Sequence, residues 1–222
     1  MEKICLHNFL LPHDFVEYRE KLFHELQKYS YFRSTSPIRL SGGGESCRYV
    51  DGRQTTLTGK ASALIGQLFL HLILRLACDI RAIGGPSVGA DPLVSSTITV
   101  AGLTDHLVRD GFYIRKEPKK HGVTDLIVGG GRLKNGTRVA LCDDVITSGE
   151  SLFRAIQIAK NHKVGRVDRS FEVQLVLALV DREENNARVR LLAEVPKVVS
   201  LFRLSDFRYK ECRPLRLPGV DI

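Results

Sequence analysis

The sequence lacks closely spaced cysteines and any long apolar run free of polar residues. Its cysteines are odd in number, scattered, and never arranged as a CxxC pair: Cys5, Cys47, Cys78, Cys142 and Cys212. This spacing argues against a disulfide framework and against a zinc site, and it is typical of a reducing cytoplasm. No basic region leads into an apolar stretch at the N-terminus, so we expect no signal peptide and a cytoplasmic location.

The most apolar window, Ala61–Ala77, is interrupted by polar residues at helical spacing. Gln67, His71 and Arg75 follow one another every four residues, so they fall on one face of a helix. A membrane span is the alternative, but a single polar stripe without interfacial aromatic anchors is better explained by a buried helix with one solvated edge. The sequence therefore predicts no contact with a membrane.

The composition is that of a soluble globular protein, with 222 residues, 43% of them hydrophobic and 26% charged, enough for one domain with a substantial core. The formal net charge is +8, and part of it is concentrated in Arg115–His121. Surplus positive charge suits nucleic acid, an acidic surface or a phosphorylated small molecule, or serves solubility alone. Since the chain has neither a recognition-helix pattern nor the aromatic-rich stretches of single-strand binders, nucleic acid is the less favoured partner.

Short apolar stretches alternate with helical patterns along most of the chain. The helical patterns cover roughly residues 60–77, 90–108 and 150–163. Strands without strict polar–apolar alternation are typical of a parallel sheet covered on both faces, so the predicted fold class is α/β, with a doubly wound, mostly parallel sheet. Residues 1–57 are predicted to form an N-terminal helix and hood segment, and residues 58–222 the core of what is one compact domain.

The stretch RVALCDDVITSGESL, Arg138–Leu152, places two adjacent acids after a buried strand and a hydroxyl-rich turn before a helix. In an open parallel sheet, ligands bind at the carboxyl ends of the strands, where the following helices present their N-termini. We predict the strand at Val139–Cys142, so Asp143 and Asp144 emerge at its carboxyl end. The hydroxyls and backbone N–H groups of Thr147–Ser151 can converge on one phosphate. The carboxylates, which would repel phosphate, can face sugar hydroxyls or a divalent cation.

A phosphate cradle joined to an acidic pair that binds a diol predicts a site for a ribose 5-phosphate. A helix-capping turn is the simpler alternative, but capping requires one such residue and leaves the second acid and the full hydroxyl series unexplained. A Walker loop is excluded, since Gly131–Arg138 has the glycine spacing but carries Thr-Arg where Lys-Ser/Thr is required.

Five stretches of the sequence resemble the motifs of a known family. LCDDVITSGES is similar to the phosphoribosyl-pyrophosphate (PRPP) motif of type I phosphoribosyltransferases, and YIRKEPKKHG resembles the mobile catalytic loop of the orotate phosphoribosyltransferases. GGPSVGADPL resembles that family's pyrophosphate-side loop, and YVDGR and VDREE match its flanking pieces in the same order. The resemblance extends over roughly residues 38–205, and it implies a type I phosphoribosyltransferase-like fold with a small N-terminal hood.

The resemblance also implies an activity, the transfer of the 5-phosphoribosyl group from PRPP to orotate. The products would be orotidine 5′-monophosphate and pyrophosphate, in de novo pyrimidine (UMP) biosynthesis. Mg²⁺ would arrive with PRPP, without a metal site of the protein's own, and a homodimer is implied because the family's basic loop reaches the neighbouring subunit's site. Two alternatives stay open: a phosphoribosyltransferase for another base, and a PRPP-sensing regulator that binds nucleic acid, against which the intact catalytic loop argues.

Roles for single residues follow from the same resemblance. The acidic pair, Asp143 and Asp144, would hold the ribose hydroxyls and, with Lys119 and His121 of the basic loop, would be catalytic. The basic loop would close over the pyrophosphate, and the arginine of VDREE would take the orotate carboxylate. The predicted binding residues are Thr147 and Arg182 for orotate and, for PRPP, Arg115, Lys116, Lys119, His121, Asp143, Asp144, Val145, Ile146, Thr147, Ser148, Gly149, Glu150 and Ser151.

The chain departs from the family pattern at four positions. SGGGESCRY lacks the lysine that many members carry near the base, and Glu45 stands close to its place. Gly89 replaces a lysine of some members in the pyrophosphate-side loop, and Lys120 replaces an aspartate in the catalytic loop. Glu150 stands where a small residue is usual in the phosphate cradle, so we expect its side chain to point outward.

Overall fold

The computed structural model describes residues 12–39, 44–108, 110–118, 125–164 and 167–208. Its centre is a six-stranded sheet of order β10-β9-β6-β3-β4-β5, in which each neighbouring pair is parallel except β4 and β5. Two smaller sheets, β1-β2 and β7-β8, are separate from it. The strands are β1 Tyr31–Arg39, β2 Glu45–Val50, β3 Ala82–Pro86, β4 Asp110–Ile114, β5 Ile127–Gly129, β6 Thr137–Ile146, β7 His162–Val164, β8 Val167–Arg169, β9 Phe171–Asp181 and β10 Val198–Arg203.

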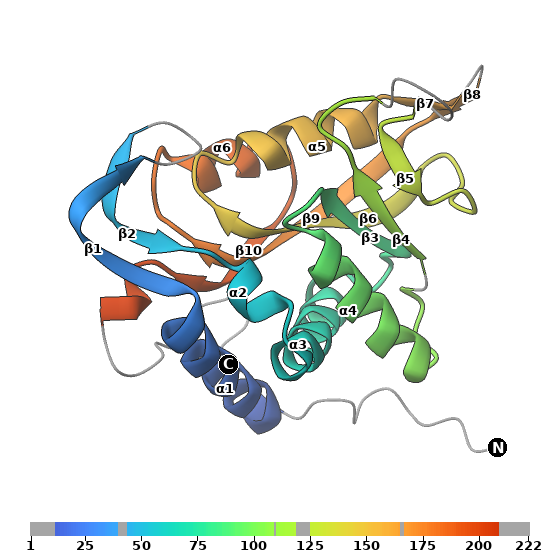
Figure 1. The fold of residues 1–222 in the computed structure, drawn as a ribbon. Helices are drawn as coiled ribbons and strands as arrows, with labels where there is room; N and C mark the ends of the chain where they lie inside the picture. Colours follow the sequence, from blue (N-terminus) through green and yellow to red (C-terminus); the bar gives the residue numbers. More distant parts are fainter. Residues whose placement is uncertain (1–11, 40–43, 109, 119–124, 165–166, 209–222) are drawn as a thin grey trace.

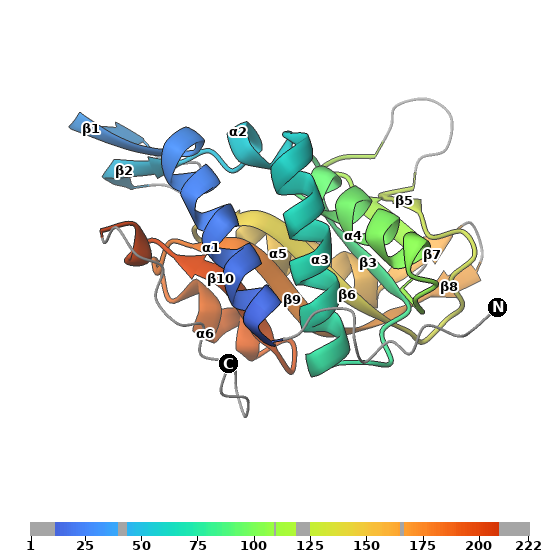
Figure 2. The same ribbon diagram turned by 90° about the horizontal axis from the view of Figure 1, so that it is seen from below.

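Helices cover both faces of the central sheet (Figures 1 and 2). Helices α1, α3 and α4 lie on one face, and α5 and α6 lie on the other. The α/β class with a doubly wound, mostly parallel sheet is therefore confirmed. The helices are α1 Pro12–Tyr29, α2 Arg53–Thr56, α3 Gly59–Leu76, α4 Asp91–Leu103, α5 Glu150–Lys160 and α6 Ala187–Leu192, with a 3₁₀ turn, η2, at Asp206–Arg208.

The central strands are apolar on both faces because each face carries its own hydrophobic cluster. On β6, Ala140 and Cys142 belong to the cluster under α1, α3 and α4, whereas Val139 and Leu141 belong to the cluster under α5. Successive residues of a strand point to opposite sides, so a strand covered twice is apolar at every position. The sheet is thereby fixed from both sides, and the ends of its strands are held in place.

The N-terminal segment contributes a helix to the core and a separate pair of strands. The ring of Phe23, on α1, lies 5.4 Å from that of Phe202 and 5.1 Å from that of Phe207, so α1 shares the cluster of the sheet. Strands β1 and β2 pair with each other in antiparallel fashion, with a register shift between Arg33 and Ile38, and extend away from the body (Figure 2).

Two helices are shorter than the sequence predicts. The helix predicted at 90–108 ends at Leu103, where the hydroxyl of Thr104 donates back to two carbonyls of the last turn. The helix predicted at 150–163 ends at Lys160, and the residues that follow pair as β7 and β8. Both errors lie at the ends of elements, where local hydrogen bonds rather than apolar spacing decide the boundary.

The apolar window of the sequence forms α3, which is buried as predicted. The expected solvated edge is only partly present: Arg75 is exposed, but His71 is 9% exposed and its ring centroid lies 4.9 Å from that of Phe15. The reason is α1, which covers this part of α3. Across the ranges that the structure describes, every helix falls short of the length and apolarity needed to cross a membrane.

The buried His71 should make stability depend on pH. Burial, and to a lesser degree the charge of Arg75, lowers its pKa from 6.5 to about 4. Between these two values the unfolded chain binds a proton that the folded chain does not, so the free energy of unfolding falls as the pH falls. In His71→Leu this decrease, followed by urea unfolding at several pH values, should be smaller. His24→Leu, at an exposed position of α1, should keep the wild-type slope, and the same slope in both variants would contradict the assignment.

Candidate functional site

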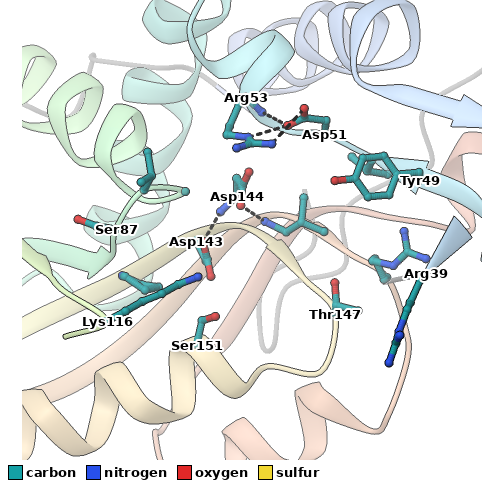
Figure 3. A pocket seen from close by; sticks show the side chains of 16 residues that line it. Arg39, Tyr49, Asp51, Arg53, Ser87, Lys116, Asp143, Asp144, Thr147 and Ser151 are labelled. Carbon is teal, nitrogen blue, oxygen red and sulfur yellow. Dashed lines mark hydrogen bonds and ion pairs between the residues drawn. The ribbon is translucent and has the colours of Figure 1, made fainter. Parts of the chain in front are cut away.

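A cavity of about 760 Å³ opens at the carboxyl ends of the central strands, where an open parallel sheet binds its ligands (Figure 3). The ends of β3, β6 and β9 contribute to it, together with the strands β1 and β2 and the start of α5. It is lined by Arg39, Tyr49, Val50, Asp51, Arg53, Pro86, Ser87, Val88, Gly89, Lys116, Asp143, Asp144, Val145, Thr147, Ser151 and Arg182.

The two adjacent acids lie on β6, near the middle of the cavity (Figure 3). The strand was predicted to end at Cys142, but it continues to Ile146 because its parallel pairing with β9 runs through both acids. The backbone N–H of Asp144 donates to Oδ1 of Asp143 at 3.0 Å, and that of Val145 donates to Oδ1 of Asp144 at 2.9 Å. The strand and these hydrogen bonds fix the directions of both carboxylates.

Both carboxyls are held in surroundings that disfavour their charge. Burial raises the pKa of Asp143 well above its ordinary value, the charge of Asp144 adds to this, and the Lys116 ammonium opposes it. Burial likewise raises the pKa of Asp144, against the N–H of Val145 and the charge of Arg53. Hydrogen-bond donors from a ligand would favour the ionised forms. The pair is thus suited to a ligand that brings hydroxyl groups or a cation.

Two glycines allow backbone to pack directly against these carboxylates. A Cβ at Gly89 would lie 2.6 Å from Oδ1 of Asp143 and 2.6 Å from Oδ1 of Asp144. A Cβ at Gly52 would lie 2.8 Å from Oδ2 of Asp144. Such distances are closer than real Cβ contacts, so any side chain at either position must displace a carboxylate. Gly89 departs from the family pattern, and its lack of a side chain leaves room for the two carboxylates in the positions that the structure shows.

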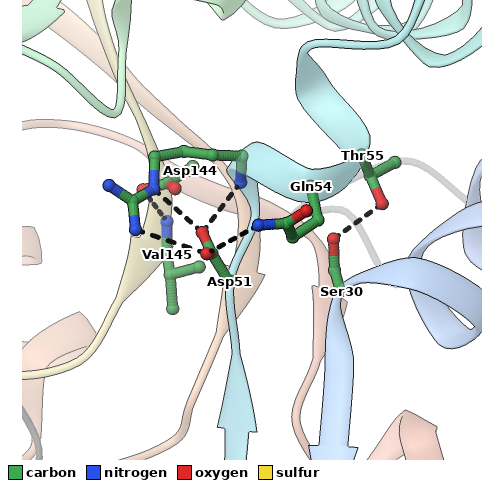
Figure 4. Close-up of polar contacts among 7 residues, drawn as sticks. Ser30, Asp51, Gln54, Thr55, Asp144 and Val145 are labelled. Atoms are coloured by element: carbon green, nitrogen blue, oxygen red, sulfur yellow. Dashed lines mark hydrogen bonds and ion pairs between the residues drawn. The ribbon is translucent and has the colours of Figure 1, made fainter.

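A polar network at the start of α2 faces Asp144 (Figures 3 and 4). Arg53 donates to Asp51, with Nε 2.9 Å from Oδ1, and Nε2 of Gln54 lies 3.4 Å from Oδ2 of Asp51. These contacts, above all the one with Arg53, lower the pKa of Asp51. Behind the network, the hydroxyls of Ser30 and Thr55 are 2.6 Å apart and join α2 to the end of α1.

The hydroxyl-rich turn joins β6 to α5 beside the acidic pair. Gly149 precedes α5 with φ of 76°, a left-handed conformation that glycine adopts without steric cost. Thr147 and Ser151 line the cavity of the acidic pair, whereas Ser148 and Glu150 line an adjoining cavity of about 690 Å³. Glu150 is exposed, as expected, and a carboxylate oxygen lies 3.6 Å from Nη2 of Arg190.

Arg182 reaches the cavity from the end of β9 and is fixed by three hydrogen bonds. Its Nε and Nη2 donate to the two carboxylate oxygens of Glu184, at 3.2 and 2.8 Å, and its Nη1 donates to the carbonyl of Arg48 at 3.0 Å. Its side chain is 2% exposed. The guanidinium is held rigidly, and the charge of Glu184 compensates its own.

The structure brings most of the predicted site residues together. The larger cavity collects Lys116, Asp143, Asp144, Val145, Thr147, Ser151 and Arg182, and the adjoining cavity has Arg115, Ser148 and Glu150. Ile146 is 1% exposed, and neither it nor Gly149 lines either cavity. Lys119 and His121 lie outside the described residues.

Several cavity residues were absent from the predicted binding set. Tyr49 and Arg53 belong to the stretch YVDGR, and Ser87 to GGPSVGADPL, so the resemblance contained a signal for them that was not extended to single residues. For Arg39 the sequence offered no signal, because its place in the cavity depends on how β1 and β2 pair and project beside the central sheet.

An open, mostly parallel sheet with an acidic pair and a hydroxyl-rich turn at the end of a central strand is the architecture of the type I phosphoribosyltransferases. No family model matches the chain. It is 36% identical to the orotate phosphoribosyltransferase of Aquifex aeolicus, over 85% of this chain and 96% of that protein. It is 37% identical to the orotate phosphoribosyltransferase of Rhodopirellula baltica, over 64% of this chain and 71% of that one. The chain belongs to the orotate phosphoribosyltransferase family.

Solved structures agree with this assignment. The orotate phosphoribosyltransferase of Mycobacterium tuberculosis in complex with Fe(III) dicitrate matches with a TM-score of 0.65 and 29% identity, covering 86% of this chain and 99% of that chain. The same enzyme in complex with PRPP matches with a TM-score of 0.61 and 26% identity, covering 86% and 92%. The adenine phosphoribosyltransferase of Leishmania tarentolae, at 15% identity and a TM-score of 0.57, shares the fold.

The buried acidic pair should lower stability when no ligand is bound. Asp143→Asn keeps an oxygen acceptor for the N–H of Asp144 but removes a buried charge, so the free energy of unfolding at pH 8 should rise by about 1–3 kcal/mol. Because folding raises the pKa of Asp143, the protonated carboxyl favours the folded state. This stabilisation is present at low pH and is lost as the pH rises through the pKa of the folded protein. The gain should therefore shrink toward about pH 4. Asp110→Asn, outside both cavities, is the control; a loss of stability in Asp143→Asn at pH 8 would contradict this account.

Proposed function

We propose that the protein transfers the 5-phosphoribosyl group from PRPP to orotate, giving orotidine 5′-monophosphate and pyrophosphate, in pyrimidine biosynthesis. The proposal rests on one cavity that is lined by the acidic pair of β6, the turn before α5 and Lys116. The chain that forms this cavity belongs to the orotate phosphoribosyltransferase family. The bond from the ribose carbon to pyrophosphate breaks, the bond to the base nitrogen forms, and that nitrogen loses its proton, so the transfer balances without a redox cofactor.

The acidic pair acts on the ribose. Asp143 and Asp144 accept hydrogen bonds from its two hydroxyls, which restores the ionised forms that burial disfavours. As the leaving group departs, the ribosyl centre becomes cationic, and two carboxylates nearby stabilise that charge more strongly than they stabilise the ground state. Thr147 and Ser151, beside the N-terminus of α5, hold the 5-phosphate.

The pyrophosphate gains negative charge as it leaves, and the basic loop compensates it. Lys116 lines the cavity on the side of Ser87, away from Tyr49 (Figure 3). Lys119 and His121, outside the described residues, complete this set in the proposal, and His121 supplies a proton or a hydrogen bond. Mg²⁺ carried with PRPP would supply further positive charge at the pyrophosphate. In the described part of the chain no group of three or more His, Cys, Asp or Glu side chains is arranged so that it could hold a metal ion.

A cytoplasmic location belongs to the same proposal. The cysteines within the described ranges, Cys47, Cys78 and Cys142, are free thiols, which suits a reducing compartment.

The function is tested by supplying PRPP and Mg²⁺ with one base at a time and measuring pyrophosphate release. Orotate should support turnover, whereas adenine, guanine and uracil should give little or none. Release with a purine in place of orotate would contradict the choice of base and leave the phosphoribosyl transfer intact. Omission of Mg²⁺ with chelation should abolish turnover with orotate, and full activity without the metal would contradict its role.

We also propose a homodimer in which each basic loop serves the partner's site. Lys119→Ala removes a loop cation and Asp144→Asn removes a ribose carboxylate, so each variant alone should be almost inactive. With equal amounts and free exchange, half of the dimers are mixed, and each mixed dimer has one site with both parts intact. About a quarter of the wild-type activity should therefore return. Exchange is verified with tags on the two variants; no recovery despite exchange would mean that each loop closes over its own subunit.

A further inference from the structure

The two ends of the larger cavity differ in the charges that line them. Figure 3 places Ser87 and Lys116 at one end, the acidic pair in the middle, and Arg39 and Tyr49 at the other end. If the pyrophosphate leaves toward Lys116, the base enters at the opposite end. Three arginines line the cavity, and they differ in whether an acid compensates their charge.

Two of these arginines are paired within the protein. Arg182 is bound through two N–H groups to Glu184, and Arg53 is paired with Asp51. A guanidinium has five N–H donors, so Arg182, which uses three of them, still offers two hydrogen bonds to a ligand. Its pairing with Glu184 means that it adds no net positive charge to this end of the cavity.

Arg39 is the arginine left to supply that charge. It ends β1, its side chain is exposed, and it has no hydrogen bond or ion pair with any residue in the described ranges. Its cross-strand neighbour is Glu45, but the guanidinium nitrogens of Arg39 lie more than 4.0 Å from the carboxylate oxygens of Glu45, so the two do not form an ion pair. The guanidinium of Arg39 is therefore available to an anion in the cavity.

We propose that Arg39 is a specificity-determining residue, which binds the carboxylate of the base through charge-assisted hydrogen bonds. The inference rests on the proposed use of orotate and adds a residue that the sequence did not indicate. Arg182 then donates hydrogen bonds from a fixed, charge-compensated position, and Arg39 adds the net charge that distinguishes a carboxylated pyrimidine from a neutral one. A hydrogen bond between charged groups is about twice as strong as one between neutral groups, so this contact would dominate the selection.

Steady-state kinetics of Arg39→Gln tests the proposal. The KM for orotate should rise about tenfold to a hundredfold, while the KM for PRPP stays within about twofold of wild type. Preference for orotate over uracil, which lacks the carboxylate, should fall by a similar factor, and Arg39→Lys should restore part of it. An unchanged KM for orotate, or equal losses for orotate and uracil, would overturn the assignment.

Two control variants separate recognition from a structural role. Arg33→Gln removes the same charge from the same strand outside the cavity, and Glu45→Gln removes the cross-strand acid. Both should leave the KM for orotate within about twofold of wild type. If Glu45→Gln reproduces the loss seen in Arg39→Gln, the two residues act as an ion pair that supports the strands, and the proposal fails. Wild-type protein without turnover on orotate would instead refute the proposed function, which distinguishes the two failures.

Discussion

The burial of two adjacent carboxylates at the end of β6 is the constraint on which the rest of the site depends. Burial raises the pKa of both groups, and the charge of Asp144 raises that of Asp143 further, so folding works against this arrangement. It persists because β6 is fixed on both faces by hydrophobic clusters and by its pairing with β9. The hydrophobic core thus supplies the free energy that holds a polar site in an unfavourable state until a ligand satisfies it.

The neighbours of the acidic pair follow from this constraint. Gly52 and Gly89 have no side chains because backbone packs against the carboxylates. Arg53 lies close enough to reduce the pKa of Asp144, but it is paired with Asp51 and does not neutralise the pair. A full ion pair at this position would compete with the sugar hydroxyls of the proposed substrate. The arrangement keeps the carboxylates ionisable and leaves their acceptor sites to the substrate.

The sequence predicted the parts of this structure that are local or periodic. The α/β class followed from apolar strands between helices, and the site followed from a contiguous motif. The length of β6 and the antiparallel β5 depend on strand pairing across the sheet, which one segment cannot reveal. The hydrogen bonds between Arg182 and Glu184 depend on the side-chain rotamers that the folded protein selects. The position of Arg39 in the cavity depends on the pairing of β1 with β2. Such contacts between distant segments leave no pattern in a single sequence.

The central sheet and the β1-β2 hood contribute different residues to the cavity, and the two sheets are separate. The residues proposed to contact the ribose and phosphate lie on β6 and the turn before α5, where any displacement disturbs the core. Arg39 and Tyr49 lie on a two-stranded sheet that is not part of the central one, so their side chains can change without moving Asp143 or Asp144. If Arg39 selects the base as proposed, substitutions on the hood can alter base selection, while Arg182 and the residues proposed for the transfer chemistry stay fixed at the ends of the central strands. The motif on β6 therefore indicates phosphoribosyl transfer without naming the base, because Arg39, the residue proposed to select the base, lies outside the five stretches that resemble the family.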